Sequence, residues 1–243
     1  MNAIETQGLT RQFQTLTAVD HLDLAVKQGE LFALLGVNGA GKTTAIRMLC
    51  GLIAPTSGDA LVMGKSVVRE TGAVKAAIAV SPQETAVGRH LTVRENLMLM
   101  AGLHGCSRAE ARQKTEAMLE RLRLAEAADR RAGKLSGGWM RRLSIAMALI
   151  SEPQVLFLDE PTLGLDVLIR RELWQVIRGL KGKSTIVLTT HYLEEAEALS
   201  DRIGILAHGR LTALGTAAEL MEKAGAKTFE DAFIALAGEE AAL

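Results

Sequence analysis

The sequence predicts an α/β fold, in which a mostly parallel sheet carries helices on both of its faces. Two observations lead to this prediction. Short apolar segments alternate with segments of helical period from residue 30 onward, and this alternation is typical of parallel sheets. Some strand-like segments, such as Val155–Leu158, are apolar at every position, which indicates strands that are buried on both faces.

The first part of the chain predicts a small antiparallel β subdomain that leads into the main sheet. The first 35 residues hold short alternating apolar stretches and turn signals, such as Leu22–Val26 followed by Gln28-Gly29. The next predicted elements are a buried strand, a helix after a glycine-rich loop, and a second buried strand, at Glu30–Leu35, Lys42–Cys50 and Ala76–Val80.

The middle of the chain predicts a helical insertion. Apolar residues recur at helical spacing from about Val93 to Leu124, and helix resumes at Trp139–Ile150. Because this stretch interrupts the alternation of strands and helices, we interpret residues 89–150 as an inserted helical subdomain.

The alternation resumes after this insertion. The predicted elements are strands at 155–158 and 185–189, helices at 167–180 and 193–200, and a hairpin at 203–214 that turns at His208-Gly209. We therefore expect one domain whose core comprises residues 1–88 and 151–220, followed by a short helical tail at 221–243.

The composition favours a globular protein and argues against a nucleic-acid partner. Hydrophobic residues make up 48% of the 243 positions, and the only two cysteines exclude a disulfide framework. The 28 basic and 28 acidic residues give a formal net charge of zero, whereas a protein that coats nucleic acid usually carries a basic excess. No apolar run approaches the roughly 20 residues of a membrane span, so we expect that the chain does not cross a bilayer, although it could lie against one through a partner.

The strongest motif is the loop Gly36–Thr43, which matches G-x-x-x-x-G-K-[ST] in full. It follows a predicted strand and opens a predicted helix, the context of a phosphate-binding loop. Its glycines let consecutive N–H groups point at phosphate oxygens, and the helix N-terminus adds partial positive charge. We expect Lys42 to reach the β- and γ-phosphates and the Thr43 hydroxyl to bind Mg²⁺. An ordinary glycine-rich turn is the alternative.

A pair of carboxylates follows the buried strand Val155–Leu158. Asp159 is suited to hold Mg²⁺ through water, and Glu160 is suited to polarise an attacking water as a general base. An Asp-Glu pair after a strand is usually a solvated start of a loop. The phosphate-binding loop upstream favours the hydrolytic interpretation, since both parts of such a site are then present.

A second glycine-containing start of a helix occurs at Leu135–Trp139. Ser136 is a favourable N-cap residue, and Gly137 and Gly138 expose N–H groups at the start of a helix that contains Arg141 and Arg142. Taken alone, this segment fits an anion site and an ordinary capped helix about equally well.

Together these motifs resemble those of the ATP-binding subunits of ABC transporters, in the same order and over nearly the whole chain. Gly36–Thr44 is similar to the Walker A loop of that family, and Val155–Glu160 is similar to its Walker B strand. Leu135–Trp139 resembles the ABC signature. The other matching motifs are the Q-loop at Ser81–Gln83, the D-loop at Gly164–Asp166 and the switch histidine, His191.

The resemblance implies a P-loop NTPase core of the RecA-like type, with ATP and Mg²⁺ as ligands. It implies catalytic roles for Glu160, His191 and Gln83, and metal contacts from Thr43, Gln83 and Asp159. Phe13 matches the aromatic position that stacks on adenine. The remaining implied nucleotide contacts are Gly36, Asn38, Gly39, Ala40, Gly41, Lys42, Thr43, Thr44, Ser136, Gly137, Gly138 and Asp166.

The resemblance also implies that two ATP-binding subunits, expected to be identical, pair head to tail. Lys42 of one subunit and Ser136, Gly137 and Gly138 of the other would then grip the same ATP, and closure would follow from contacts made only in the closed dimer. Trp139 departs from the family pattern, which has Gln at this position. An indole cannot reproduce the hydrogen bonds of an amide, so we expect Trp139 to pack at the dimer interface or against the signature helix.

Ordinary structural roles remain open for three of these residues. His191 could be a satisfied loop histidine, although its place after the strand Thr185–Thr189 favours a γ-phosphate contact. Phe13 could be a core residue, and Gln83 could be a polar turn residue after Pro82. The family pattern favours the functional interpretation of each.

The C-terminal part of the sequence is similar to the ATP subunits of ABC-2-type exporters, at residues 190–197 and 228–234. This implies a transmembrane permease on a separate chain and a peripheral location at the cytoplasmic face of the cell membrane. A terminal amphipathic helix is the simpler interpretation of the tail. The alternative function is a soluble ABC ATPase of iron–sulfur cluster assembly without a membrane partner. DNA-repair ATPases of the superfamily carry a long coiled coil before the signature, and no sustained heptads occur here.

Charge is distributed unevenly despite the neutral total. From Arg108 to Arg142, Lys and Arg outnumber Asp and Glu by ten to five. A solvated helical face is the simpler explanation. The sharper hypothesis is that this basic segment lies near the anionic membrane surface and the permease.

Overall fold

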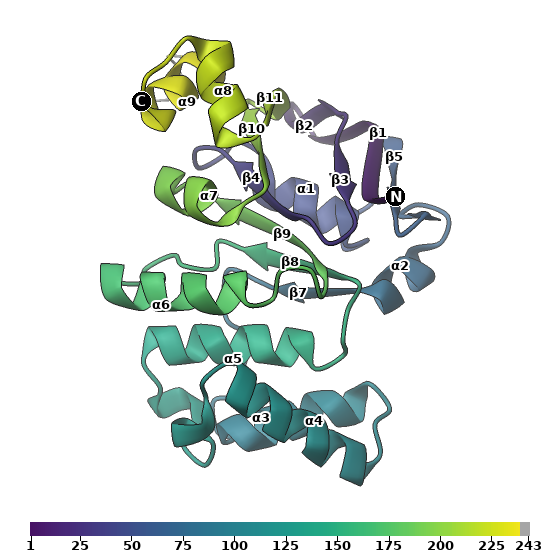
Figure 1. Ribbon diagram of the computed structural model, residues 1–243. Helices are drawn as coiled ribbons and strands as arrows, with labels where there is room; N and C mark the ends of the chain where they lie inside the picture. Colours follow the sequence, from purple (N-terminus) through teal and green to yellow (C-terminus); the bar gives the residue numbers. More distant parts are fainter. Residues whose placement is uncertain (239–243) are drawn as a thin grey trace.

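The computed structural model describes residues 1–238 and contains two sheets and a group of helices (Figure 1). The smaller sheet has five strands in the order β2-β1-β5-β6, with β3 paired to β1, and all of its pairings are antiparallel. Its strands are β1 (Asn2–Phe13), β2 (Leu16–Leu22), β3 (Ala25–Lys27), β5 (Ser57–Val62) and β6 (Lys65–Ser66). The predicted N-terminal antiparallel subdomain is confirmed, although the sequence analysis did not identify β5 and β6.

The larger sheet has six strands in the order β11-β10-β4-β9-β8-β7. Five of them are parallel, and β11 at one edge runs antiparallel to β10. The strands are β4 (Leu31–Leu35), β7 (Ile78–Ser81), β8 (Val155–Asp159), β9 (Thr185–Thr190), β10 (Arg202–Ala207) and β11 (Arg210–Gly215). The mostly parallel sheet that the alternation predicted is therefore confirmed.

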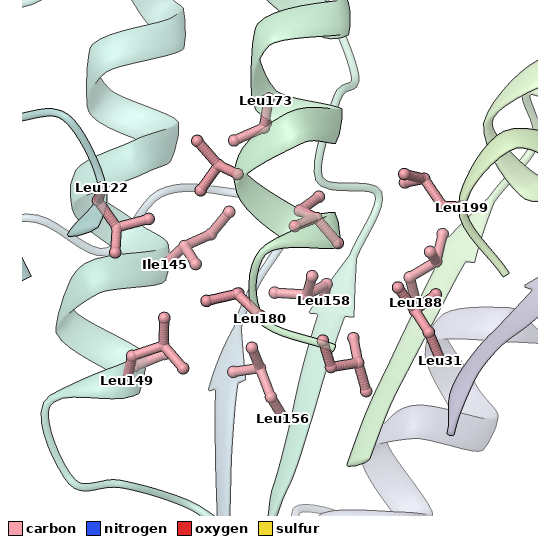
Figure 2. Packing of buried hydrophobic residues seen from close by; sticks show 14 of the residues in the cluster. Leu31, Leu122, Ile145, Leu149, Leu156, Leu158, Leu173, Leu180, Leu188 and Leu199 are labelled. Carbon is pink, nitrogen blue, oxygen red and sulfur yellow. The ribbon is translucent and has the colours of Figure 1, made fainter. Parts of the chain in front are cut away.

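Both faces of this sheet are covered, which explains its continuously apolar strands. In β8, Leu156 and Leu158 pack with one hydrophobic cluster, whereas Val155 and Phe157 pack with the other. Figure 2 shows the first cluster, where leucines of the sheet meet side chains of three helices. These helices are α5 (Gly137–Leu149), α6 (Val167–Arg178) and α7 (Leu193–Leu199). Each buried Leu contributes about 1.5–3 kcal/mol relative to an exposed one, so both faces hold the sheet in place.

The second cluster joins the opposite face of the sheet to the N-terminal subdomain. Phe32 of β4 and Phe157 of β8 pack there with Ile46 of helix α1 (Lys42–Leu49) and Leu9 of β1. Helix α1 is thereby enclosed between the two sheets (Figure 1). This packing fixes the start of α1, which the glycine-rich loop precedes.

The middle of the chain is helical, but as separate helices. The pattern from Val93 to Leu124 forms α3 (Val93–Leu103) and α4 (Arg108–Arg121). Between them Gly105 adopts a φ of 80°, a left-handed conformation that ends a helix. Ser107 and Glu110 then form a capping box that starts α4. The helical period from Val93 to Leu124 is therefore confirmed, but it is divided between two helices at this turn, where the capping signal was present in the sequence.

Two other predicted boundaries differ from the structure. Residues 76 and 77, predicted as the start of a strand, are the end of helix α2 (Thr71–Ala77), because pairing with β8 begins only at Ile78. The predicted boundary between core and tail at residue 220 falls inside helix α8 (Ala217–Ala224), and helix α9 (Phe229–Ala237) follows. Residues 239–243 of the predicted tail lie outside the described residues.

The helices of the described part of the chain include none that is long and apolar enough to cross a membrane.

Candidate functional site

Three loops that carry predicted site residues leave the same edge of the larger sheet. Strands β4, β9 and β8 are parallel neighbours, and their last residues lie side by side, with Leu35 opposite Thr190 and Asp159 opposite Thr189. Ligands of open α/β sheets bind at this carboxyl edge. The segments that begin at Gly36, Glu160 and His191 are therefore brought together by strand register, although they are far apart in the sequence.

A cleft of about 630 Å³ opens at this edge. The predicted residues that line it are Phe13, Asn38, Gly39, Ala40, Gly41, Lys42, Thr43, Thr44, Gln83, Glu160 and His191. Residues not identified from the sequence complete the lining, namely Leu16, Thr17, Ala18, Leu163, His208 and Gly209. The last two form the β10–β11 turn, and Gly209 donates its N–H to the Ala40 carbonyl at 3.1 Å.

The glycine-rich loop wraps tightly around the Lys42 side chain. The Lys42 ammonium donates to the carbonyls of Gly36 at 2.7 Å and Val37 at 3.1 Å, and it lies 3.2 Å from Glu160 Oε1. Gly41 has a φ of 103°, and a Cβ there would lie 2.2 Å from the Ala18 carbonyl oxygen, so only glycine fits. The lysine is therefore buried, pre-positioned at the start of α1 and paired with a carboxylate.

Glu160 joins two other charged or titratable side chains of the cleft, Lys42 and His191. Its carboxylate is 7% exposed and contacts both Lys42 and His191, whose Nδ1 is 2.8 Å from Glu160 Oε2. Glu160 also has a φ of 48°, a left-handed backbone that is costly for a residue with a side chain. Its N–H donates to Thr189 Oγ1 at 3.0 Å. A strained backbone and a carboxylate paired on both oxygens are the arrangement expected of a functional residue.

Asp159 lines an adjoining groove of about 400 Å³, which shares Thr43 and Gln83 with the cleft. Asp159 Oδ1 accepts hydrogen bonds from Thr43 Oγ1 at 3.2 Å and from Thr189 Oγ1 at 2.5 Å. Carboxylate, hydroxyl and amide oxygens are hard ligands that suit Mg²⁺. Residues 1–238 contain no cluster of three or more His, Cys, Asp or Glu that could enclose a metal. The oxygens of Thr43, Gln83 and Asp159 fit an ion that takes its other ligands from water or from a bound molecule.

Phe13 lies at the rim of the cleft and is 41% exposed. The Arg11 guanidinium lies 4.5 Å from the centre of its ring, and Arg11 also donates to the Ala54 carbonyl at 2.7 Å. The half-exposed ring argues against the alternative of a core residue. Its stacking on adenine stays a prediction.

The signature residues lie elsewhere. Within the described chain, Ser136, Gly137 and Gly138 are absent from the lining of the cleft. Ser136 and Gly137 are exposed at the start of α5, and no N–H of residues 1–238 caps the helix by donating to the Ser136 side chain, contrary to its predicted capping role. Gly138 is buried, and a Cβ there would lie 2.3 Å from Ile169 Cγ2. Close packing of α5 on α6 therefore requires this glycine.

Two other predicted residues, Asp166 and Trp139, have structural roles. Asp166 caps helix α6 by accepting from the N–H groups of Leu168 and Ile169, each at 3.0 Å, and it lies outside the cleft lining, as does Gly36. Trp139 is partly buried against the larger cluster, with the Arg142 guanidinium 5.7 Å from its ring. Arg142 pairs with Glu172 of α6. Trp139 thus packs against the signature helix, which was one of the two positions expected for it.

Sequence reasoning missed two polar groups that hold the site. Thr189 bonds both Asp159 and Glu160, and a polar residue at the end of an apolar strand was the available signal. Arg141 is 5% exposed and donates to backbone carbonyls beside the cleft. Because Arg141 and Arg142 are both buried, two of the cations counted in the basic segment do not face solvent.

Comparisons with known proteins agree with this geometry. Residues 19–163 match the family model described as "ABC transporter". The chain is 44% identical to the daunorubicin/doxorubicin resistance ATP-binding protein DrrA of Streptomyces peucetius over 92% of this chain and 68% of the relative. It is 43% identical to the Nod factor export ATP-binding protein I of Rhizobium sp. (strain N33), over 91% and 73% of the two chains. A solved structure described as an ATP binding subunit of an ABC transporter superposes with a TM-score of 0.85 and 29% identity, covering 97% of this chain and all of the other.

Proposed function

Because the chain belongs to the ABC transporter family and is an ATPase of that family, we propose that it is the ATP-hydrolysing subunit of an exporter whose permease is a separate transmembrane chain. The observation that carries this proposal is the cleft in which Lys42, Glu160 and His191 meet. The names of the similar drug-resistance and Nod factor export proteins support the direction of transport.

In this proposal the triphosphate of ATP lies along the glycine-rich loop. Lys42 exchanges its contact with Glu160 for phosphate oxygens, and the N–H groups of Gly39 and Gly41 face the phosphates at the start of α1. Asn38, Ala40, Thr43 and Thr44 complete the lining of this loop. The base stacks on Phe13.

Hydrolysis then depends on the carboxylate that Lys42 releases. Glu160 accepts a proton from the attacking water, and His191, 2.8 Å away, orients Glu160 and contacts the γ-phosphate. The Thr189 hydroxyl donates to Asp159 and accepts from the Glu160 N–H, and these two bonds keep Asp159 and Glu160 at fixed positions. Thr43, Gln83 and Asp159 would hold Mg²⁺, which when bound would neutralise charge on the phosphates.

The position of the signature supports a second subunit as part of the site. Ser136 and Gly137 are exposed and outside the cleft, so they are free to bind the ATP of a second copy of this chain. We propose a head-to-tail homodimer in which each site takes Lys42 from one copy and Ser136, Gly137 and Gly138 from the other. Asp166, which caps α6, would lie near that interface.

We propose that the chain is divided into a core, at residues 1–88 and 151–220, and a helical subdomain, at residues 89–150. Coupling to a permease would place the protein at the cytoplasmic face of the membrane as a peripheral subunit. The basic segment of residues 108–142, apart from the buried Arg141 and Arg142, is suited to the anionic headgroups there, and reversing its charges should then weaken binding of the permease.

The experiment that tests this function is purification of the tagged chain from solubilised membranes and from the soluble fraction of the same cells. We expect a membrane permease in the sample from solubilised membranes. When this complex is reconstituted in vesicles, its rate of ATP hydrolysis should rise together with its rate of transport. Recovery with soluble assembly proteins of iron–sulfur clusters, and no permease, would favour the alternative function instead.

A further inference from the structure

Arg141 is buried at the junction of three segments that the proposed mechanism uses. Its guanidinium donates to the Pro82 carbonyl at 2.7 Å, to the Gln83 carbonyl at 2.7 Å and to the Glu160 carbonyl at 3.3 Å. The first two belong to the loop after β7, and the third belongs to the residue after β8. One side chain therefore joins the backbones of two segments that carry predicted catalytic residues.

The helix that carries Arg141 adds the third segment. Helix α5 begins at Gly137, directly after Ser136, and Arg141 lies one turn further on. A groove of about 450 Å³ runs between the start of α5 and the loops at 83–85 and 163–165, with Arg141 in its lining. The signature start and the backbones of Gln83 and Glu160 are thus connected through a single buried guanidinium.

The chemistry of this contact requires arginine. A guanidinium presents five N–H donors in a rigid planar fork and can reach several carbonyls at once, whereas a lysine ammonium is a point charge on a flexible stem. Burial lowers the pKa of Arg141, and Asp159, Glu195 and Glu160 oppose that effect by favouring its charged form. The site is therefore built for a charged, multiply bonded arginine.

We propose that Arg141 is a positioning residue for ATP hydrolysis, which fixes the backbones of Gln83 and Glu160 relative to the signature helix of the same chain. The proposal rests on the ATPase function proposed above. Arg141 should affect hydrolysis but not nucleotide binding, because it is absent from the lining of the cleft formed by residues 1–238. Binding of the nucleotide should not need Arg141, whereas turnover should, since a small misplacement of a catalytic group lowers the rate steeply.

The test compares Arg141→Met and Arg141→Lys with the full wild-type chain. Affinity is measured by titration with a fluorescent ATP analogue, and turnover is measured at saturating ATP and Mg²⁺. We expect kcat to fall about 10- to 100-fold in Arg141→Met, with an intermediate loss in Arg141→Lys, and nucleotide affinity to stay unchanged. The matched control is Arg178→Met. Arg178 donates to the Ala198 carbonyl at 2.6 Å but lies outside the cleft and the grooves beside it.

Amide hydrogen exchange separates positioning from a general loss of structure. Exchange at residues 83–86 should accelerate in Arg141→Lys, while exchange in β8 and α1 stays as in the wild type. Wild-type turnover in Arg141→Met would overturn the inference, and so would a parallel loss of nucleotide affinity, melting temperature and turnover in both variants. A wild-type chain that neither binds nor hydrolyses ATP would instead overturn the proposed function on which the inference rests.

Discussion

Two helices of this chain begin beside glycines in a way that suits an anion, but their surroundings are opposite. At the start of α1, Lys42 is buried and bonded to two carbonyls and the Glu160 carboxylate of its own chain. At the start of α5, Ser136 and Gly137 are exposed, and no described residue caps the helix through the Ser136 side chain. The polar groups at the first helix start are paired within their own chain, whereas those at the second face solvent.

This difference indicates how the proposed ATPase cycle is divided between the two helix starts. In the proposed mechanism, the α1 start and its cleft supply Lys42 for the triphosphate and Glu160 for the attacking water. The α5 start exposes only Ser136 and Gly137 of its three predicted nucleotide contacts. Changes at the two helix starts should therefore separate chemistry and nucleotide binding, at α1, from closure of the dimer, at α5.

The largest effect is expected for Glu160→Gln, beside the α1 start. Loss of a general base lowers the rate by about 10²- to 10⁴-fold, while Gln keeps the volume of the side chain. We expect ATP to bind and to remain unhydrolysed, which traps a dimer. Single-turnover hydrolysis and gel filtration with ATP measure these outcomes. Full turnover in this variant would remove Glu160 as the base.

The next effect concerns Lys42→Ala. A charge-assisted hydrogen bond contributes about 1.5–3 kcal/mol, which corresponds to a roughly 10- to 150-fold weaker affinity for ATP. Titration with a fluorescent ATP analogue measures this loss. The exposed Lys183→Ala provides a control that keeps wild-type affinity. Undiminished affinity in Lys42→Ala would contradict the phosphate-binding role of the loop.

A smaller effect is expected at the α5 start, for Ser136→Ala. The loss of one hydroxyl contact of about 1.5 kcal/mol should lower turnover roughly tenfold and weaken ATP-dependent dimerisation, but leave the affinity of the single subunit for ATP unchanged. Turnover and gel filtration with ATP measure these outcomes.

Thermal unfolding tests separately whether Ser136 caps its helix. Ser107 accepts a capping bond from the Glu110 N–H, so Ser107→Ala should cost about 1 kcal/mol of stability, and Ser136→Ala should cost almost none. A large stability loss in Ser136→Ala would refute its open position.

The smallest effect is expected for Trp139→Gln, also at the α5 start. Trp139 packs against its own helix and the larger hydrophobic cluster, so the change should leave ATPase activity within a few-fold of the wild type. Steady-state ATPase assays and gel filtration measure this. A collapse of ATP-driven dimerisation would mean that Trp139 makes an essential contact with the second subunit.

Local patterns predicted most of the fold. Continuously apolar segments identified β4, β8 and β9, because strands covered on both faces have no polar side. Boundaries failed where two local tendencies compete. Residues 76 and 77 are alanines, which favour helix, and only pairing with β8 decides where strand β7 begins. The two short strands β5 and β6 depend on pairing with β1 and with each other, which no local pattern encodes.

Short motifs were enough to predict the chemistry of this protein, since the glycine-rich loop, the Asp159-Glu160 pair and the signature each occupy a few consecutive residues. Which of these groups meet depends on how the chain packs. Strand register brings Lys42, Glu160 and His191 within contact of one another, and the packing of α5 on α6 keeps Gly138 buried outside the cleft. The role of Arg141 belongs to the second kind, because its partners at Gln83 and Glu160 are distant in sequence and become neighbours only when the sheet and the helical insertion pack together.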